Sequence, residues 1–458
     1  MNLSKVVFLF FCLCLLSCAI PNKQEDKAKE QVHDLPELQK LGELRAATLY
    51  SSTSYFEYRA IPMGYEYELI KDFAHSYGLH LNIVVAENQA RLEEMLMKGE
   101  ADISIYPHFI DRRKTNILYC GREEQSTQVL IQRAEKADTL LTNVTQLVGK
   151  KLYVSSNDRF NQRLVNLNEE LGGGILIKHV PKDTLTSEDL IGMVSKGVIP
   201  YVVCDDRTAR LNKTYYWNID IGLQVSFPQR TAWIVHKDQP LLAAAIDKWA
   251  ATSTKKPRFK SITKRYFEQS KRPLQTPIPS TKDGQISPYD DLFKRYASRL
   301  DWDWELLASI AFQESRFNAN VRGWSGATGL MGIMPSTARA FGSSPHKLTD
   351  PEESVRVGVE CLFRFRKGLS RIKDPEEKIK FTLASYNAGL GHVYDAQRLA
   401  EKYGRDPLRW DGNVAEYIRL KSDPKYYNDP VVKHGYLRGT ETFLYVKEVL
   451  QRFKSLKK

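Results

Sequence analysis

Hydrophobic and polar residues along residues 44–267 alternate with two periods, one typical of short strands and one typical of amphipathic helices. The stretch 67–77, for example, places Leu69, Ile70 and Phe73 on one helix face and stops before Gly78. Runs with strand character are 44–50, 81–85, 101–106, 152–155 and 175–179, and helical stretches are 67–77, 88–98, 160–171, 187–196, 242–250 and 262–267. This alternation predicts an α/β fold with a largely parallel sheet. Because the pattern restarts near residue 152, we expect two lobes with a cleft between them, a common place for a ligand.

A carboxylate interrupts the apolar face of a second predicted helix, in the C-terminal half. Trp304, Leu307, Ala308, Ile310 and Ala311 repeat at three-to-four spacing, and Glu314 falls on the same face. An apolar setting disfavours the charged form of a carboxyl group, which suits a proton donor in a sugar-cleaving site. A structural glutamate that caps a helix or pairs with an arginine would occupy the same position, so both interpretations stay open at this point.

Three further motifs follow this helix in order. The four segments are 311–317 (AFQESRF), 329–335 (GLMGIMP), 384–389 (ASYNAG) and 441–446 (ETFLYV). Together they resemble the catalytic domain of the soluble-type lytic transglycosylases, lysozyme-like enzymes that cut the glycan strands of peptidoglycan. The resemblance covers roughly residues 289–449 and implies a mostly α, lysozyme-like domain.

The resemblance also implies roles for individual residues. Glu314 corresponds to the single catalytic acid/base of that family. Tyr386 and Asn387 correspond to residues that line the saccharide cleft, Tyr445 to one that lies close to the catalytic glutamate, and we place Ser315 and Met331 in the same substrate-binding set. One position departs from the family pattern: Gly332 stands where many members carry glutamine, so we assign it no binding role.

The expected chemistry needs only one carboxylate. The nearby acids Asp350, Glu352 and Glu353 form a helix start, where acids are favourable. The resemblance implies that Glu314 protonates the oxygen between N-acetylmuramic acid and N-acetylglucosamine and then deprotonates the muramoyl C6 hydroxyl, which closes on C1. The product is a 1,6-anhydromuramoyl end. The alternatives are a hydrolytic muramidase and a non-enzymatic receptor for solutes or muropeptides.

The N-terminal half resembles the family 3 extracellular solute-binding proteins, which implies a two-lobed α/β domain like that of periplasmic binding proteins. The segments that carry this resemblance are 44–48, 64–69, 99–102, 111–113 and 201–205. In amino-acid-binding members an arginine holds the ligand carboxylate, here Arg113 (or Arg112), and an aspartate holds the ammonium group, here Asp205 (or Asp206). An aromatic residue covers the ligand, here Tyr55 or Phe56. The alternative is a scaffold that has lost its ligand.

The first residues predict export and lipidation. Lys5 precedes an apolar run at 6–16 that is too short to span a bilayer and suits a signal peptide. Leu15-Leu16-Ser17-Cys18 resembles a lipobox, so acyl chains on Cys18 would hold the protein at a membrane surface. We therefore expect a lipid-anchored protein of the cell envelope, at the outer membrane and facing the periplasm. A cleaved signal with an incidental cysteine is the alternative.

Composition adds the domain boundaries and excludes several classes of site. The expected order is a signal peptide at 1–18, a polar tether at 19–40, a solute-binding-protein-like domain at 41–269, a Pro-containing linker at 270–287 and the catalytic domain at 288–458. Cys120, Cys204 and Cys361 remain after the signal and anchor; they are odd in number and widely spaced, which argues against disulfides or zinc, and we expect no metal or cofactor.

The charge of +12 suits anionic partners, although surface solubility alone explains it equally well. Export argues against nucleic acid. The expected partners are peptidoglycan glycan strands, a muropeptide or amino-acid ligand, and the membrane through the lipid anchor. The combined layout resembles that of the membrane-bound lytic murein transglycosylases.

Overall fold

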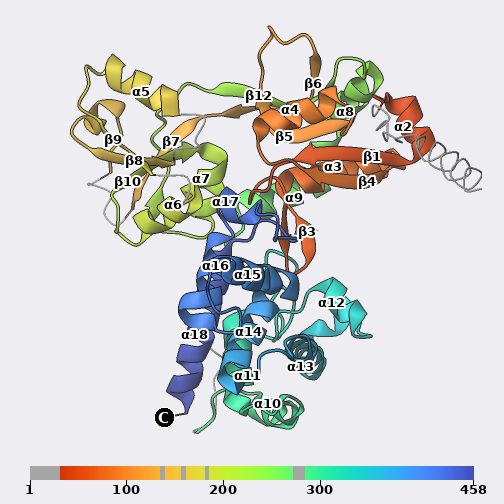
Figure 1. Ribbon diagram of the computed structural model, residues 1–458, viewed down its shortest axis with the longest axis vertical. Coiled ribbons are helices and arrows are strands. Elements are labelled where there is room, and N and C mark those ends of the chain that lie inside the picture. The colour runs from red at the N-terminus through yellow and green to blue at the C-terminus, as the bar shows by residue number, and fades with distance from the viewer. Residues whose placement is uncertain (1–30, 135–139, 156–160, 181–184, 272–283, 458) are drawn as a thin grey trace, which may run out of the picture.

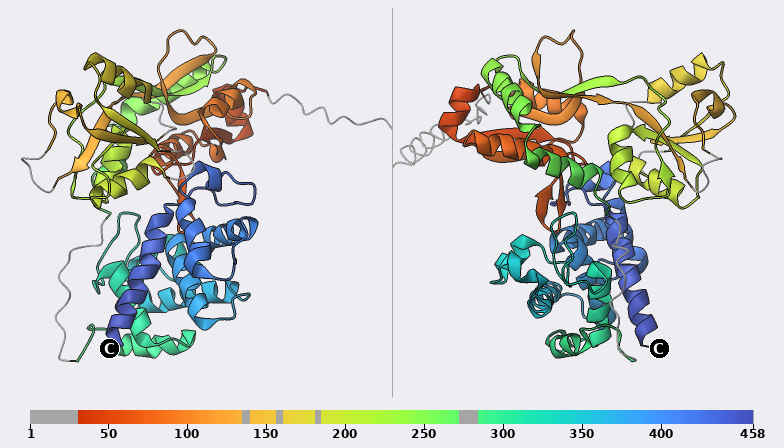
Figure 2. Two further views of the ribbon diagram at one scale, coloured as in Figure 1. Left: turned by 60° about the vertical axis from the view of Figure 1, so that its left-hand side comes forward. Right: turned by 180° about the vertical axis from the view of Figure 1, so that it is seen from behind.

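The computed structural model describes residues 31–134, 140–155, 161–180, 185–271 and 284–457. The expected signal peptide, Cys18 and most of the expected linker lie outside these residues. A two-lobed α/β domain precedes a helical domain, and the two are stacked end to end, with the C-terminus at the end farthest from the lobes (Figure 1; Figure 2). Both parts of the predicted fold class are confirmed.

Lobe 1 is built on a five-stranded sheet in the order β4-β1-β5-β12-β6. Its strands are β1 (Glu43–Thr48), β4 (His80–Val85), β5 (Ile103–Phe109), β6 (Ile117–Ser126) and β12 (Gln229–His236). Its helices are α2 (Leu35–Leu41), α3 (Tyr65–Ser76), α4 (Gln89–Met97), α8 (Pro240–Ser253) and α9 (Pro257–Phe267). β1 runs parallel to β4 and β5, whereas β12 is antiparallel to β5 and β6, so the sheet is mixed rather than largely parallel.

Lobe 2 repeats this plan with the order β11-β7-β10-β8-β9. Its strands are β7 (Gln128–Arg133), β8 (Lys151–Ser155), β9 (Leu176–Val180), β10 (Tyr201–Asp205) and β11 (Ile219–Asp220), and its helices are α5 (Asn161–Glu170), α6 (Ser187–Ser195) and α7 (Asp206–Lys213). β6 leads directly into β7, so one nearly continuous strand passes from lobe 1 to lobe 2. The chain returns from lobe 2 to lobe 1 between β11 and β12.

A short hairpin leaves lobe 1 toward the helical domain. It consists of β2 (Phe56–Tyr58) and β3 (Ile61–Met63), joined by Arg59 and Ala60 (Figure 1). Arg59 and Ala60 have φ values of 51° and 60°, in the left-handed region that two-residue hairpin turns require and that residues other than glycine rarely adopt. The sequence lacks the Asn-Gly type of turn signal, and we did not predict this hairpin.

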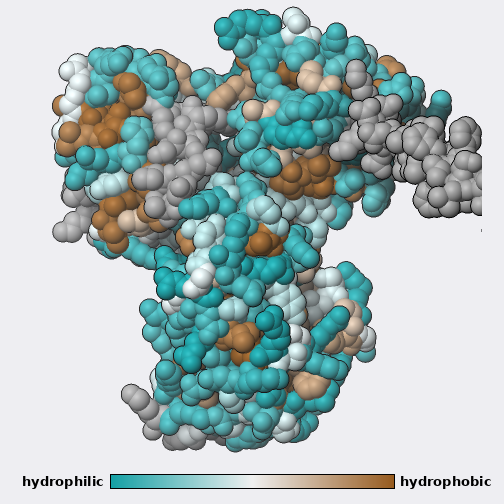
Figure 3. Space-filling model, viewed as in Figure 1, coloured by the Kyte–Doolittle hydropathy of each residue, from teal (hydrophilic) through white to brown (hydrophobic). Residues whose placement is uncertain are grey.

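The helical domain packs its helices around one hydrophobic core. They are α10 (Asp290–Ala297), α11 (Trp304–Ser315), α12 (Pro335–Ala340), α13 (Pro351–Gly368), α14 (Pro375–Ala388), α15 (Leu390–Lys402), α16 (Ala415–Leu420), α17 (Pro424–Tyr427) and α18 (Gly439–Leu456). α18 is one of the longest and contacts α11, α14 and α16. The face of the molecule seen in Figure 3 is mostly hydrophilic, with smaller apolar areas on the lobes and the helical domain.

Two boundaries differ from expectation. Helix α2 overlaps the end of the predicted tether, yet its Leu38 is buried in the core of lobe 1, so the folded domain includes residues from Leu35 onward. At the other end of the linker, Ser287 is buried and bonds to Asp290 at the start of α10. The composition of these segments is polar, and a single buried leucine gave too weak a periodic signal to reveal the helix.

Candidate active site

Helix α11 carries Glu314 in its last turn. Leu307, Ala308, Ile310 and Ala311 are buried beneath it, and the Glu314 side chain is only 7% exposed. The helix ends at once, because Arg316 takes a left-handed φ of 52° as its C-cap. The predicted position of the carboxylate on the apolar face therefore agrees with the structure.

Tyr445, from α18, contacts the carboxylate directly. Its hydroxyl donates to Glu314 Oε1 at 2.9 Å. Burial, and then the nearby Glu314 charge, raise the pKa of Tyr445 well above its usual value, so the phenol stays a hydrogen-bond donor. Asn387, at the end of α14, lines the same cavity and bonds to Thr442 of α18 at 2.8 Å. The structure thus brings together Glu314, Asn387 and Tyr445, as expected.

Three other predicted residues lie behind the cavity wall. Tyr386 is buried and its hydroxyl donates to the Met331 carbonyl at 2.7 Å. Met331 is fully buried, and its amide donates to Ser354 Oγ at 3.1 Å. The Ser315 hydroxyl donates back to the Ala311 carbonyl of its own helix at 2.8 Å. Ser315 and Met331 were expected to bind substrate, but their polar groups are used inside the domain and neither residue lines the cavity.

Arg59 of the hairpin turn covers the catalytic candidate. Its Nη2 lies 2.9 and 3.0 Å from the two carboxylate oxygens of Glu314, and its Nη1 donates to the Gly332 carbonyl at 2.6 Å. The Arg59 side chain is 10% exposed, and its guanidinium lies 5.8 Å from the Tyr386 ring centroid. Burial alone would lower the pKa of Arg59, but Glu314 raises it well above the ordinary value. Glu314 is therefore paired with an arginine, which was one of the two interpretations of its position in the sequence.

Gly332 makes this pairing sterically feasible. Its φ is +60°, and a Cβ at this position would lie 2.2 Å from Glu314 Oε2 and 2.9 Å from its Cδ. Any side chain would therefore push the carboxylate out of its contact with Arg59. The one departure from the family motif lies directly against the catalytic candidate.

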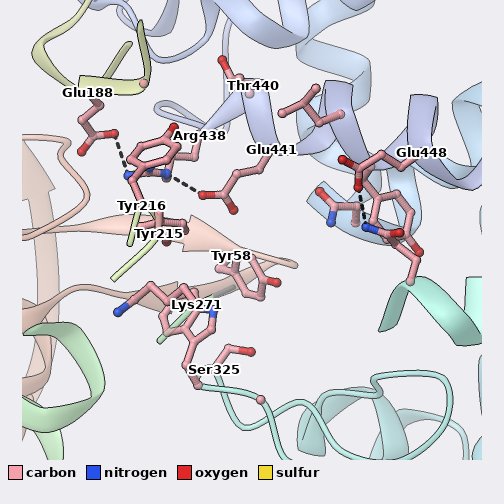
Figure 4. A pocket seen from close by; sticks show the side chains of 18 of the residues that line it. Tyr58, Glu188, Tyr215, Tyr216, Lys271, Ser325, Arg438, Thr440, Glu441 and Glu448 are labelled. Carbon is pink, nitrogen blue, oxygen red and sulfur yellow. Dashed lines mark hydrogen bonds and ion pairs between the residues drawn. The ribbon is translucent and has the colours of Figure 1, made fainter. Parts of the chain in front are cut away.

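A cavity of about 570 Å³ extends from Glu314 to lobe 2. Figure 4 shows Glu188 of α6, Tyr215 and Tyr216 after α7, Lys271, and Arg438 and Glu441 at the start of α18 around it. Arg438 Nη1 lies 3.1 Å from Glu188 Oε2, its Nε lies 2.5 Å from Glu441 Oε1, and its guanidinium lies 3.8 Å from the Tyr215 ring centroid. Burial, and then Arg438, lower the pKa of Lys271 to about 7. The cavity is formed jointly by both domains.

A second part of the helical domain, the segment 422–440, contacts both lobes. The Tyr427 ring of α17 lies 5.7 Å from Tyr50 of lobe 1, and the Tyr436 hydroxyl donates to Glu188 Oε2 of lobe 2 at 2.8 Å. His434 Nδ1 lies 3.2 Å from Glu57 Oε2 of β2. Figure 1 shows α17 at the junction of the two lobes and the helical domain. The angle between the lobes and the position of the helical domain are therefore linked.

Each residue expected to bind an amino acid makes a contact within the two-lobed domain. The Arg113 side chain is 90% exposed and pairs with Asp111 at 2.8 Å, whereas Asp205 caps α7 by accepting from the Thr208 amide at 2.9 Å. Tyr55 stacks on Tyr50, with ring centroids 5.8 Å apart, so it belongs to the aromatic cluster that meets Tyr427.

Arg59 and Thr442 are the contacts that we did not predict. Arg59 lies 255 residues before Glu314, and nothing in its local sequence marks it as an active-site residue. Thr442 belongs to the 441–446 motif, and its three-residue spacing from Tyr445 is the signal that could have placed both on one helix face. Among the described residues, no group of three or more His, Cys, Asp or Glu side chains is arranged to hold a metal ion.

Comparisons with known proteins match both halves. A family model described as Transglycosylase SLT domain matches residues 291–408, and one for bacterial extracellular solute-binding proteins, family 3, matches residues 46–269. Membrane-bound lytic murein transglycosylase F of Desulfosudis oleivorans is 29% identical over 94% of this chain and 93% of that chain. The protein of the same name from Aeromonas salmonicida is 29% identical over 92% of this chain and 84% of that chain. A solved ancestral cationic amino acid solute-binding protein aligns with 51% of this chain and 99% of its own, at 17% identity and a TM-score of 0.44.

Proposed function

We propose that this membrane-bound lytic murein transglycosylase F-like protein, a peptidoglycan lytic transglycosylase, cleaves the bond between N-acetylmuramic acid and N-acetylglucosamine without water and leaves 1,6-anhydromuramoyl ends. The observation that carries the proposal is the buried Glu314 carboxylate in the lining of a cavity, with the Tyr445 hydroxyl 2.9 Å away. A single acid/base on a rigid helix suffices when the nucleophile belongs to the substrate itself.

In this mechanism Glu314 first donates its proton to the bridging oxygen, so that the bond to the muramoyl C1 breaks. The resulting Glu314 carboxylate then takes the proton of the C6 hydroxyl, and that oxygen bonds to C1 of the same sugar. Tyr445 donates a hydrogen bond that orients the carboxylate and stabilises its charged form between the two steps. Closure within one sugar has an entropic advantage over capture of a water molecule.

The test is mass spectrometry of fragments released from purified sacculi. The anhydro product is lighter than the hydrolysis product by one water, so the alternative of a hydrolytic muramidase is decided by the same spectrum. Glu314→Gln keeps the shape of the side chain but cannot donate or accept the proton, and we expect its rate to fall to less than about a hundredth of wild type. A higher residual rate would contradict the role of Glu314, and the absence of any release by both wild type and Arg59→Ala would favour the receptor alternative.

We further propose that the protein is held at a membrane of the cell envelope by acyl chains on Cys18, at the outer membrane and facing the periplasm. The relatives are named as membrane-bound, and the apolar run before Cys18 supports export. No helix in the described residues is long and apolar enough to cross a membrane.

The two-lobed domain is proposed to regulate the enzyme by binding an amino acid or a stem-peptide fragment of peptidoglycan. Two observations support this: Arg59 covers Glu314, and the segment 422–440 contacts both lobes. A ligand that favours a different lobe angle would weaken these contacts and free the carboxylate, by no more than its differential affinity for the two arrangements.

Arg113 pairs with Asp111 and Asp205 caps α7, so an amino acid held by these two residues would have to compete with these contacts. Calorimetry with free amino acids and wall peptides, on wild type and Arg113→Ala, tests the binding. If no candidate binds, or the variant binds equally well, the domain is a scaffold that keeps the enzyme near the wall.

A further inference from the structure

Helix α18 presents three side chains to the active site at intervals of three residues. This spacing places Thr442, Tyr445 and Glu448 along one face of the helix. The three hydrogen bonds join Thr442 Oγ1 to Asn387 Oδ1 at 2.8 Å, Tyr445 Oη to Glu314 Oε1 at 2.9 Å, and Gln313 Nε2 to Glu448 Oε2 at 2.7 Å. The helix thus fixes the orientation of three neighbouring side chains around one cavity.

The contact between Thr442 and Asn387 fixes which end of the Asn387 side-chain amide bonds to the threonine and which end is left for the cavity. Thr442 is 1% exposed, and its hydroxyl donates to Oδ1 of Asn387. Asn387 is partly exposed and lines the cavity. Within the described residues its Nδ2 donates to no protein acceptor. Since one end of the amide is held by the threonine, the other end offers two N–H donors to whatever occupies the cavity.

We propose that Thr442 is a positioning residue that holds Asn387 as a hydrogen-bond donor toward the glycan. The group recognised is a sugar oxygen that accepts, such as an acetamido carbonyl or a hydroxyl oxygen. Without the threonine hydroxyl the amide can turn over, and its carbonyl then faces the substrate oxygen instead. The inference rests on the proposed function, because it takes the cavity to be the glycan site.

The experiment compares Thr442→Val with Thr442→Ser, both in an Arg59→Ala background that leaves the site open. On soluble glycan strands we expect Thr442→Val to raise KM by about five- to tenfold with kcat within about twofold, the size of one hydrogen bond made equally in ground and transition states. Thr442→Ser keeps the donor and should restore KM. The matched control is Thr382→Val, because Thr382 is equally buried and its hydroxyl bonds only to the Lys378 carbonyl of its own helix, at 2.6 Å.

A second measurement does not depend on cleavage. Binding of chitotriose to the same variants, made with Glu314→Gln, should weaken by the same factor in Thr442→Val but not in Thr442→Ser or Thr382→Val. If the valine variant does not fold, Asn387→Asp replaces the donor by an acceptor and should lose the same affinity. Equal KM and equal binding for the valine and serine variants, or undiminished binding by Asn387→Asp, would overturn the proposal. Failure of the proposed function would show differently, as absent product release with the binding difference intact.

Discussion

Removal of the Arg59 side chain should activate the enzyme. Arg59 holds both carboxylate oxygens of Glu314 and the Gly332 carbonyl, at 2.6 to 3.0 Å, in a site that is nearly closed to solvent. Glu314 cannot act as an acid in this arrangement, because the guanidinium occupies both carboxylate oxygens and fills the space in which a glycosidic oxygen would lie. Arg59→Ala removes both obstacles.

The magnitude follows from these contacts. Hydrogen bonds to charged groups contribute about 1.5–3 kcal/mol each. The other contacts between the domains, such as Glu188 with Arg438, are unaffected by the change. We therefore assign about 1–3 kcal/mol to the contribution of Arg59 to the closed form, in which the hairpin covers Glu314. This free energy corresponds to about 5- to 150-fold in the population of the open form. The rate of release from sacculi should rise by a factor in this range. Arg59→Lys keeps the charge but has one nitrogen in place of the two that bond to Glu314 and to the Gly332 carbonyl, and its rate should fall in between.

The assay is the rate of muropeptide release from purified sacculi, measured by chromatography on full-length protein. Arg299→Ala is the matched control, since it breaks an exposed Arg–Glu pair, Arg299 with Glu360 at 3.0 Å, elsewhere on the helical domain. Arg59→Ala combined with Glu314→Gln should be inactive. A rate for Arg59→Ala within twofold of wild type, or below it, would refute the view that this ion pair restrains the enzyme.

Three further predictions concern anchoring, pH and stability. Cys18→Ser should release the protein from the membrane fraction, and association that persists in high salt would contradict lipidation. The pKa of Lys271 is lowered to about 7, so between about pH 7 and 10.4 the unfolded chain binds a proton that the folded chain does not. The unfolding free energy of wild type minus that of Lys271→Met should therefore rise with pH over this window. If this difference, measured by thermal unfolding, does not change with pH, the result would count against the burial of Lys271. Lys421 is fully buried, with its Nζ 2.6 Å from Asp395 Oδ2, and Arg398 pairs with the other oxygen of the same carboxylate. Lys421→Met therefore removes one of two cations from a buried carboxylate and should cost about 1.5–3 kcal/mol in urea unfolding. A loss below about 1 kcal/mol would mean that Arg398 and the amides of Lys433 and His434 satisfy Asp395 without Lys421.

Periodicity and motif order predicted the parts of the molecule that are locally encoded. The helix that carries Glu314 follows from apolar spacing, and the contact of Tyr445 with Glu314 follows from the motif resemblance. The sequence did not reveal that both sheets are mixed. The antiparallel strands β6, β7 and β12 lie next to the two points where the chain passes between the lobes, and their partners are set by chain topology. Arg59 could not be predicted at all, since its role depends on a hairpin turn in the left-handed region and on contact with a domain 255 residues away.

The site residues divide in the same way. Ser315 and Met331 stand in the right motifs, but a motif does not say which side of its backbone faces the cavity. The ligand residues of the two-lobed domain were placed by their order along the chain, whereas assembly of Arg113 with Asp205 depends on the angle between lobes. That angle is a tertiary quantity, fixed here by aromatic and ionic contacts with the helical domain.

The first turn of α18 has a further consequence for local order. Its N-cap, Arg438, supplies no side-chain hydrogen bond to the amides of that turn, and the guanidinium pairs instead with Glu188 of lobe 2. When lobe 2 separates, Arg438 loses its ion pair with Glu188, so the turn that carries Thr442 becomes prone to fraying. Amide exchange at residues 440–443 would then report whether lobe 2 is seated, while the turns beyond Tyr445 stay protected by the hydrophobic core. Helix α18 therefore forms part of the catalytic cleft, and amide exchange in its first turn reports whether lobe 2 is in contact with it.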